Sequence, residues 1–328
     1  MTIPIGRKGQ RRLPTRICAF TLALAAVTAT ASIALATSLD GKLSWTAQAP
    51  LPTARGGLAS ATEDGQIFVL GGLTSGEATT LNTVQAYNPQ TKHWRTLAPM
   101  PTARGFLGAA SVDGQIYAIG GSDNPGNALA TVESYDPTTG SWKTDAPLRV
   151  PSGFITAAAH AGHIYAAGGL DSAGNALASL QIYDPKSNTW KRGRPMPTAR
   201  GLAGVTWSGG HLYAIGGLAN GTPVGAVEAY DPQTNTWQTK APIPIPRSHP
   251  AVGTLGNGQI IVAGGGPVPA TADVELYTPS TNKWQRLTPL PKASIPTGAV
   301  LGGDTFFVIG GFIGQLQASN LVEATIVP

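Results

Sequence analysis

Four arginines recur at one position of a repeating pattern, and together they could form a site for an anion. Arg55, Arg104 and Arg200 each end the sequence Pro-Thr-Ala-Arg, and Arg247 ends a similar proline-rich segment. Guanidinium groups hold carboxylates and other anions through paired hydrogen bonds. The same groups can instead bond carbonyl oxygens of a neighbouring repeat and set its spacing, so the sequence leaves both roles open.

Two further copies of this position carry serine, Ser152 and Ser294, which we include among the candidate ligand contacts. His249 follows Arg247 by two residues, so on one strand both side chains would point the same way. Here the other copies carry Gly57, Phe106, Phe154, Leu202 and Pro296. A histidine beside an arginine could act as an acid, a base or a ligand contact. A packing role is the alternative, and we keep His249 as a weak catalytic candidate.

The elements that must position these residues follow from an internal repeat. Glycine pairs that each follow a short apolar run recur every 46–49 residues, at Gly71-Gly72, Gly120-Gly121, Gly168-Gly169, Gly216-Gly217, Gly264-Gly265 and Gly310-Gly311. A tyrosine and, seven residues later, a tryptophan recur with the same period in five copies, from Tyr87 and Trp94 to Tyr277 and Trp284. Turn signals divide each unit into four short strands, which predicts propeller blades.

Six glycine pairs predict six blades, and the ends of the chain predict how the ring closes. The last repeat stops without a tryptophan, whereas an outer strand with Trp45 precedes the first repeat. We therefore expect residues 43–48 to complete the last blade beside residues 321–327 and to leave no open sheet edge there. Packing accounts for the periodic glycines and aromatics, so we assign none of them to a cofactor.

The pattern of apolar run, Gly-Gly, loop, Tyr-Asp-Pro, Trp and Pro-x-Pro-x-x-Arg resembles the kelch repeat and covers residues 43–328. The resemblance implies an all-β, six-bladed kelch propeller with four antiparallel strands per blade. In kelch binders the crossover between blades and the longer loops contact ligands, so the resemblance implies ligand contacts here too. Exported six-bladed kelch proteins also resemble the bacterial N-acetylneuraminate epimerase, a mutarotase of a sugar acid.

The first residues predict export. Residues 1–16 are polar and basic, and residues 17–36 carry no charge and end in Ala-Leu-Ala. This is typical of a signal peptide cut near Ala36, with an uncleaved signal anchor as the alternative and residues 37–42 as a short linker. We expect a periplasmic, cell-surface or secreted protein, and membrane contact only through an uncleaved anchor. Cys18 lies in this segment, so no thiol remains after cleavage.

Charge and motifs narrow the function classes. Five of the 22 basic residues precede residue 17, which leaves 17 basic against 17 acidic residues and no electrostatic attraction to nucleic acid. The sequence has no HExxH, nucleophile elbow or phosphate loop. A copper radical oxidase of the kelch-containing type is disfavoured because its cofactor needs a Tyr–Cys crosslink.

We therefore predict a monomeric module without a cofactor or metal that binds a protein or an anionic carbohydrate ligand at the arginine-rimmed mouth. A sugar-acid mutarotase is the alternative, in which the arginines would hold the carboxylate and His249 would move the proton. An envelope scaffold without a small ligand is the third possibility.

Overall fold

The computed structural model describes residues 41–327 except 76–78, 125, 268 and 302, and gives no account of the side chains of 299–301. The expected signal segment, residues 1–36, lies outside the described residues. Every regular element in the described part of the chain is a β-strand. Among these residues there is no helix with the length and apolar character that crossing a bilayer requires.

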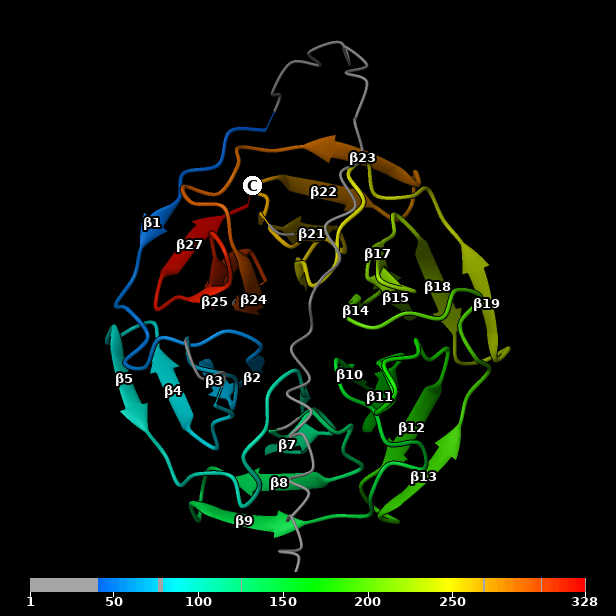
Figure 1. Cartoon of the computed structure of the whole chain (residues 1–328). Coiled ribbons are helices and arrows are strands. Elements are labelled where there is room, and N and C mark those ends of the chain that lie inside the picture. The colour runs from blue at the N-terminus through cyan, green and yellow to red at the C-terminus, as the bar shows by residue number, and fades with distance from the viewer. Residues whose placement is uncertain (1–40, 76–78, 125, 268, 302, 328) are drawn as a thin grey trace, which may run out of the picture. The chain divides into compact units, whose positions relative to one another are not determined.

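Six four-stranded antiparallel sheets follow one another around a central axis (Figure 1). Blades 1 to 3 contain β2 (Ala59–Glu63), β3 (Gln66–Leu70), β4 (Val84–Asn88) and β5 (His93–Thr96); β6 (Gly108–Val112), β7 (Gln115–Ile119), β8 (Val132–Asp136) and β9 (Ser141–Thr144); and β10 (Thr156–His160), β11 (His163–Ala167), β12 (Leu180–Asp184) and β13 (Thr189–Arg192).

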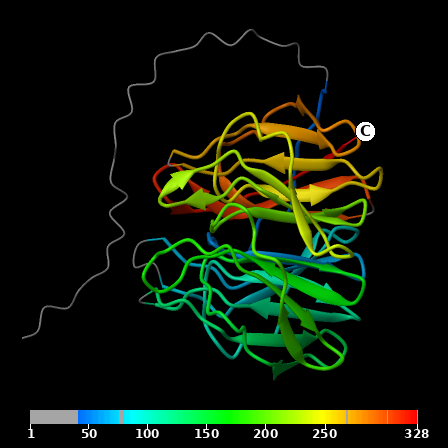
Figure 2. The same ribbon diagram turned by 90° about the vertical axis from the view of Figure 1, so that its right-hand side faces the viewer.

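Blades 4 to 6 contain β14 (Gly204–Ser208), β15 (His211–Ile215), β18 (Val227–Asp231) and β19 (Thr236–Thr239); β20 (Ala251–Thr254), β21 (Ile260–Ala263), β22 (Val274–Thr278) and β23 (Lys283–Arg286); and β24 (Ile295–Leu301), β25 (Thr305–Ile313), β27 (Val322–Ile326) and β1 (Thr46–Ala47). A short hairpin, β16 (Leu218–Ala219) and β17 (Thr222–Pro223), lies in a loop of blade 4, and β26 (Gln317–Ala318) pairs with β25. The strands run from one rim of the ring to the other (Figure 2).

The expected closure is confirmed: β1 pairs antiparallel with β27, with Thr46 opposite Ala324 and Ala47 opposite Glu323. The strand is shorter than the predicted 43–48. The residues before it instead turn towards blade 5, where Trp45 Nε1 donates to the carbonyl of Thr288 at 3.3 Å. The first residues of the propeller therefore hold the last two blades together.

The periodic tryptophans link each blade to the one before it. The indole Nε1 of Trp94 donates to the carbonyl of Ala49 at 2.9 Å, and Trp142 donates to that of Ala98 at the same distance. The equivalent bonds of the other blades come from Trp190, Trp237, Trp284 and Trp45. Each tryptophan thus uses its indole N–H to fix the position of the neighbouring blade, and in blades 1 to 5 its ring packs on the tyrosine of its own blade.

The hydrophobic core lies between neighbouring sheets rather than within one. Phe68 and Ala86 of blade 1, for example, share one buried cluster with Ala109 and Ile116 of blade 2. Each sheet is covered on both faces, which explains why the second strands read as continuous apolar runs. Stability of the ring therefore depends on every blade keeping its neighbours in place.

Candidate functional site

The crossovers that carry the candidate residues lie on the same rim as the loops between second and third strands. Gly105 pairs with Ser122, Gly153 with Leu170 and Gly201 with Leu218; each second partner directly follows a glycine pair. The second glycine of each pair donates its N–H to the carbonyl of the next crossover, as Gly121 does to Ser152 at 2.9 Å. A Cβ at Gly168 would overlap the carbonyl oxygen of Arg200, so this approach requires glycine.

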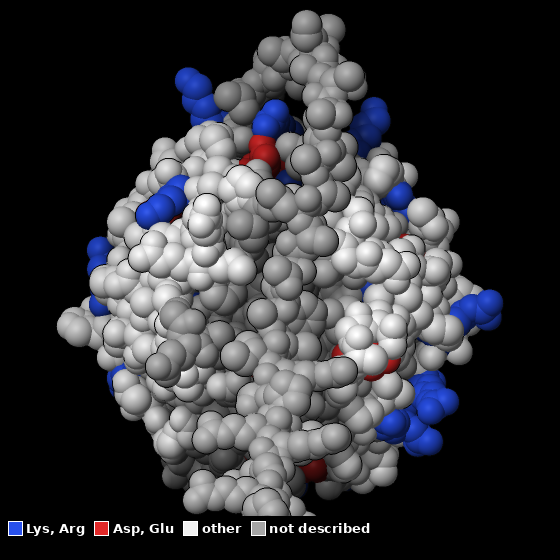
Figure 3. Space-filling model, in the orientation of Figure 1, with Lys and Arg blue, Asp and Glu red and all other residues white. Residues whose placement is uncertain are grey.

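The four arginines occupy equivalent positions in four blades, but they do not rim an open mouth. Arg55, Arg104, Arg200 and Arg247 each have 0% of their surface exposed. Each side chain points into its own blade towards the third strand. In the space-filling view, the visible Lys and Arg side chains lie around the outer edge of the molecule (Figure 3). The expected ring of accessible cations is therefore replaced by four buried ones, and none of these four guanidinium groups reaches the surface.

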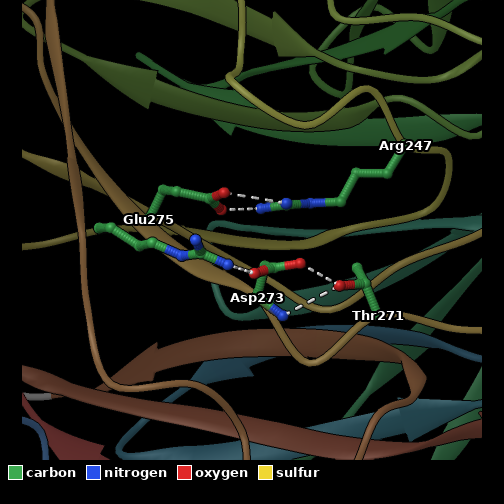
Figure 4. Close-up of polar contacts among 5 residues, drawn as sticks. Arg247, Thr271, Asp273 and Glu275 are labelled. Carbon is green, nitrogen blue, oxygen red and sulfur yellow. Dashed lines mark hydrogen bonds and ion pairs between the residues drawn. The ribbon is translucent and has the colours of Figure 1, made fainter. Parts of the chain in front are cut away.

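Carboxylates on the third strands neutralise three of these arginines. Arg104 Nη1 lies 2.7 Å from Glu133 Oε2, and Arg200 Nη2 lies 3.1 Å from Glu228 Oε2. Arg247 pairs with Glu275 in the same way, as Figure 4 shows beside a second contact, between Asp273 and Thr271. Burial lowers the pKa of Arg104 and Arg200, and the facing carboxylates offset part of that effect.

Blade 1 differs because its arginine faces a neutral amide. Arg55 Nη1 donates to Gln85 Oε1 at 2.7 Å, and Arg55 Nη2 donates to the carbonyl of Val69 at 3.3 Å. Burial lowers the pKa of Arg55 to about 10, since no carboxylate compensates for the lost solvation. The four guanidinium groups thus bond within their own blades, and not to carbonyl oxygens of a neighbouring blade as the spacing role would require.

The serine positions are buried as well. Ser152 is 0% exposed, and its hydroxyl donates to the carbonyl of Val150 at 3.0 Å. Ser294 is 6% exposed. Neither serine takes part in an exposed mouth, so neither fits the role of ligand contact that we expected for it.

Residues two positions after Arg104, Ser152, Arg200 and Arg247 form the accessible centre of this rim. We call these residues, Phe106, Phe154, Leu202 and His249, together with Phe312 of β25, the mouth cluster. The rings of Phe106 and Phe154 stack with centroids 4.2 Å apart, and Phe106 also lies 6.0 Å from the His249 ring and 6.3 Å from Phe312. All members except Phe312 are partly exposed. An apolar, aromatic surface therefore stands where we expected a cationic one.

The backbone of the mouth cluster is strained at four consecutive blades. Phe106, Phe154, Leu202 and His249 have φ angles of 51–54°, in the left-handed region that favours glycine. This conformation costs a residue with a Cβ about 1–2 kcal/mol. Only blade 1 has glycine at the equivalent position, Gly57. Bulky side chains thus persist at a place where glycine would relieve strain, which is a feature of ligand-binding sites.

The same left-handed turn separates His249 from Arg247. Arg247 is not part of a strand, because β20 begins only at Ala251. With φ of 51° at His249, the chain turns between the two residues. Arg247 then points into the blade while His249 faces the channel, so our expectation that both point the same way was wrong.

A cavity of about 100 Å³ lies on the axis beneath the mouth cluster. Inner strands of all six blades line it, mostly with small residues such as Ala59, Gly108, Ala157, Gly204, Val252 and Gly298. His249 is the only titratable side chain among the described residues of the lining. Burial lowers the pKa of His249 to about 4, so its imidazole is neutral at physiological pH.

Metal ligands and free carboxylates were the other candidates for chemistry on this rim, and the described residues offer neither kind of site. No three His, Cys, Asp or Glu residues gather there or elsewhere in these residues to hold a metal ion. Asp123 and Asp171 bond amides of their own loops, while Glu77 lies outside the described residues. The sequence reasoning missed the buried carboxylates, although a Glu or Gln recurs beside each third-strand valine or leucine and was a usable signal.

Comparison with known proteins supports the architecture. The family model of the KLHDC2/KLHL20/DRC7 Kelch-repeats domain matches residues 35–191 and 143–311. The solved structure of YjhT superposes with a TM-score of 0.73 at 20% sequence identity and covers 84% of this chain and 95% of that chain. No curated protein matches the sequence.

Proposed function

Because the chain belongs to the kelch-repeat family, we propose that this propeller is an exported, non-enzymatic module that binds a protein or glycan partner on its crossover rim. The mouth cluster is the observation that carries this proposal. Its stacked, partly exposed rings offer a surface to an apolar side chain or to the face of a sugar. The loops between second and third strands surround it and differ in sequence from blade to blade, as specificity loops do.

The strain in the mouth cluster supports a binding role over a packing role. If the position served only to complete the crossover, glycine would adopt this backbone without the cost, as Gly57 does in blade 1. Phe106 and Phe154 instead keep a conformation with a cost; Phe106 lines the axial cavity, and the ring of Phe154 stacks on that of Phe106. A partner that inserts an apolar group between the loops would bury these rings without further ordering of the site.

The mutarotase alternative requires an accessible cation for the sugar carboxylate and an acid/base group of suitable pKa. The four arginines are buried, and His249 with a pKa of about 4 lines the cavity without a carboxylate beside it among the described residues. No observation in the structure favours this reaction over binding, so we advance the binding module alone.

Selection experiments on the full chain test the proposal. Peptide display and glycan arrays would supply ligands, whose affinities are then measured for the native protein and the double variant F106A/F154A. We expect at least a tenfold loss of affinity in this variant. His211→Ala, on the opposite rim, is the matched control and should bind normally. Equal affinity of the mouth variant, or accelerated anomer exchange of a sugar acid that His249→Ala abolishes, would refute the proposal.

A further inference from the structure

The position that holds the arginines recurs in all six blades, but its charge and its burial differ. On the third strand, Glu323 of blade 6 is partly exposed, whereas the five equivalent residues are buried. A crossover residue contacts the second residue of the third strand in Arg55/Gln85, Arg104/Glu133, Arg200/Glu228 and Arg247/Glu275, and the repeat places Ser152/Gln181 and Ser294/Glu323 in the same way. We call this position the crossover slot. Three slots contain a complete ion pair, and the slot of blade 3 contains two neutral residues. The slot of blade 6 contains a carboxylate but no guanidinium.

The neutral slot of blade 3 shows how a slot without an arginine can close. Gln181 Oε1 accepts from the N–H of Val150 at 2.9 Å, and Gln181 Nε2 donates to the carbonyl of Val150 at 3.0 Å. Both polar atoms of the Gln181 side chain thus form hydrogen bonds with the crossover backbone. A carboxylate cannot do the same, because it has no donor for the carbonyl.

The slot of blade 6 contains a small cavity. Ser294 and Glu323 line one small cavity together with Leu290, Lys292 and Leu321. Its volume is about 10 Å³, which is room for a single water molecule. Lys292 is exposed and Leu321 is 36% exposed, and a guanidinium group, which is larger than this cavity, has to displace these two exposed side chains to enter.

Glu323 is the one carboxylate of these slots that lacks a cation. No ion pair links it to Lys292 or to any other described residue. Burial raises its pKa, as expected for a carboxyl group that loses water without gaining a partner.

In the slots that contain arginine, the guanidinium group also donates to a backbone carbonyl of the second strand, and blade 6 has the equivalent residue. Arg55, Arg104 and Arg200 each donate from Nη2 to a carbonyl two residues before the glycine pair: Val69, Ala118 and Ala214. The equivalent residue of blade 6 is Val308, which lines the same cavity as Glu323. The slot therefore keeps both of the oxygen acceptors that a guanidinium group uses in its sister blades.

We propose that the crossover slot of blade 6 is a binding site for a guanidinium group supplied by another molecule, either a small guanidino compound or an arginine side chain of a partner. The group would take the place that the side chain of Arg200 or Arg247 fills in blades 4 and 5. Its planar N–H donors match a carboxylate and a carbonyl better than a spherical cation does. This site is separate from the mouth cluster and does not depend on the function proposed there.

Thermal unfolding of the full chain with guanidinium chloride as the probe tests the site. From 0 to 50 mM, against equal concentrations of sodium and ammonium chloride, we expect guanidinium alone to raise the melting temperature by about 1–3 °C with saturation. Glu323→Gln should abolish the response, because it copies the neutral pair of blade 3. Ser294→Arg should abolish it too and raise the melting temperature without ligand. Ser294→Ala is the matched control that should keep the response.

A carbon-13 NMR titration of the Glu323 carboxyl provides a readout that does not depend on unfolding, and its pKa should fall when guanidinium is added. An unchanged melting temperature together with an unchanged carboxyl titration would overturn the proposal. An equal response in Glu323→Gln would also overturn it. A response that appears only in Lys292→Ser would show that Lys292 fills the slot, and the proposal would again be wrong.

Discussion

Arg104 and Phe106 lie two residues apart in the crossover into blade 2, yet they serve different parts of the molecule. Arg104 is fully buried and faces Glu133, whereas Phe106 is partly exposed over the axial channel. The left-handed turn at Phe106 produces this difference, because it directs successive side chains to the blade interior and to the mouth. One short segment therefore combines a residue that fixes the blade with a residue that faces a partner.

The largest effect on stability is expected at the buried pair of Arg104 and Glu133. Arg104→Ala leaves Glu133 buried without its cation, which should lower the free energy of unfolding by about 3–5 kcal/mol. Chemical denaturation measures this loss. The double variant R104M/E133L should recover most of it, because no buried charge then remains. A loss below about 1 kcal/mol in the single variant would place the pair in water and contradict the burial described here.

Blade 1 sharpens the comparison because its slot contains only one charge. Arg55→Ala should cost less than Arg104→Ala, about 1–3 kcal/mol, since it leaves the neutral Gln85 and not a carboxylate unpaired. Gln85→Glu should raise the unfolding midpoint by restoring the pair found in blades 2, 4 and 5. Equal costs for the two arginine variants would show that the carboxylates contribute nothing specific.

The mouth cluster predicts a dependence on acid through His249. Its pKa is about 4 in the folded protein and near its ordinary value of about 6.5 in the unfolded chain. Below pH 6.5 the unfolded state binds the additional proton, so stability should fall as the pH falls from 6.5 to 4 and level off below. The loss should be on the order of 1 kcal/mol after allowance for partial exposure. His249→Gln should flatten this part of the unfolding curve; an unchanged slope in that variant would assign the effect to other groups.

The smallest effect is expected where strain and packing oppose each other. Phe154→Gly removes the cost of a left-handed backbone, about 1–2 kcal/mol, and loses the contacts of a partly exposed ring. The free energy of unfolding should therefore change by less than about 1 kcal/mol. Phe68→Ala, in the buried cluster between blades 1 and 2, is the contrasting control and should cost about 3–5 kcal/mol. A large loss in Phe154→Gly would make Phe154 a structural residue.

The architecture was predictable because one signal is repeated. The glycine pairs and tryptophans predicted the blades, and the missing tryptophan of the last repeat predicted the pairing of β1 with β27. Each of these residues responds to forces that act within one blade or between two neighbours, so periodicity alone locates them. The export segment stays a prediction, since residues 1–36 lie outside the described part of the chain.

What the sequence alone determined is the ring of six blades and the equivalence of the positions around it. Only the tertiary structure decided where each side chain of the crossover points. A φ angle of about 50° at Phe106 or His249 is imposed by the contact with neighbouring blades, and it sends the arginines inward and the aromatic residues to the mouth. Outside blade 1, where Gly57 occupies the position, local sequence does not indicate that turn, because these residue types do not favour it and the packed ring enforces it.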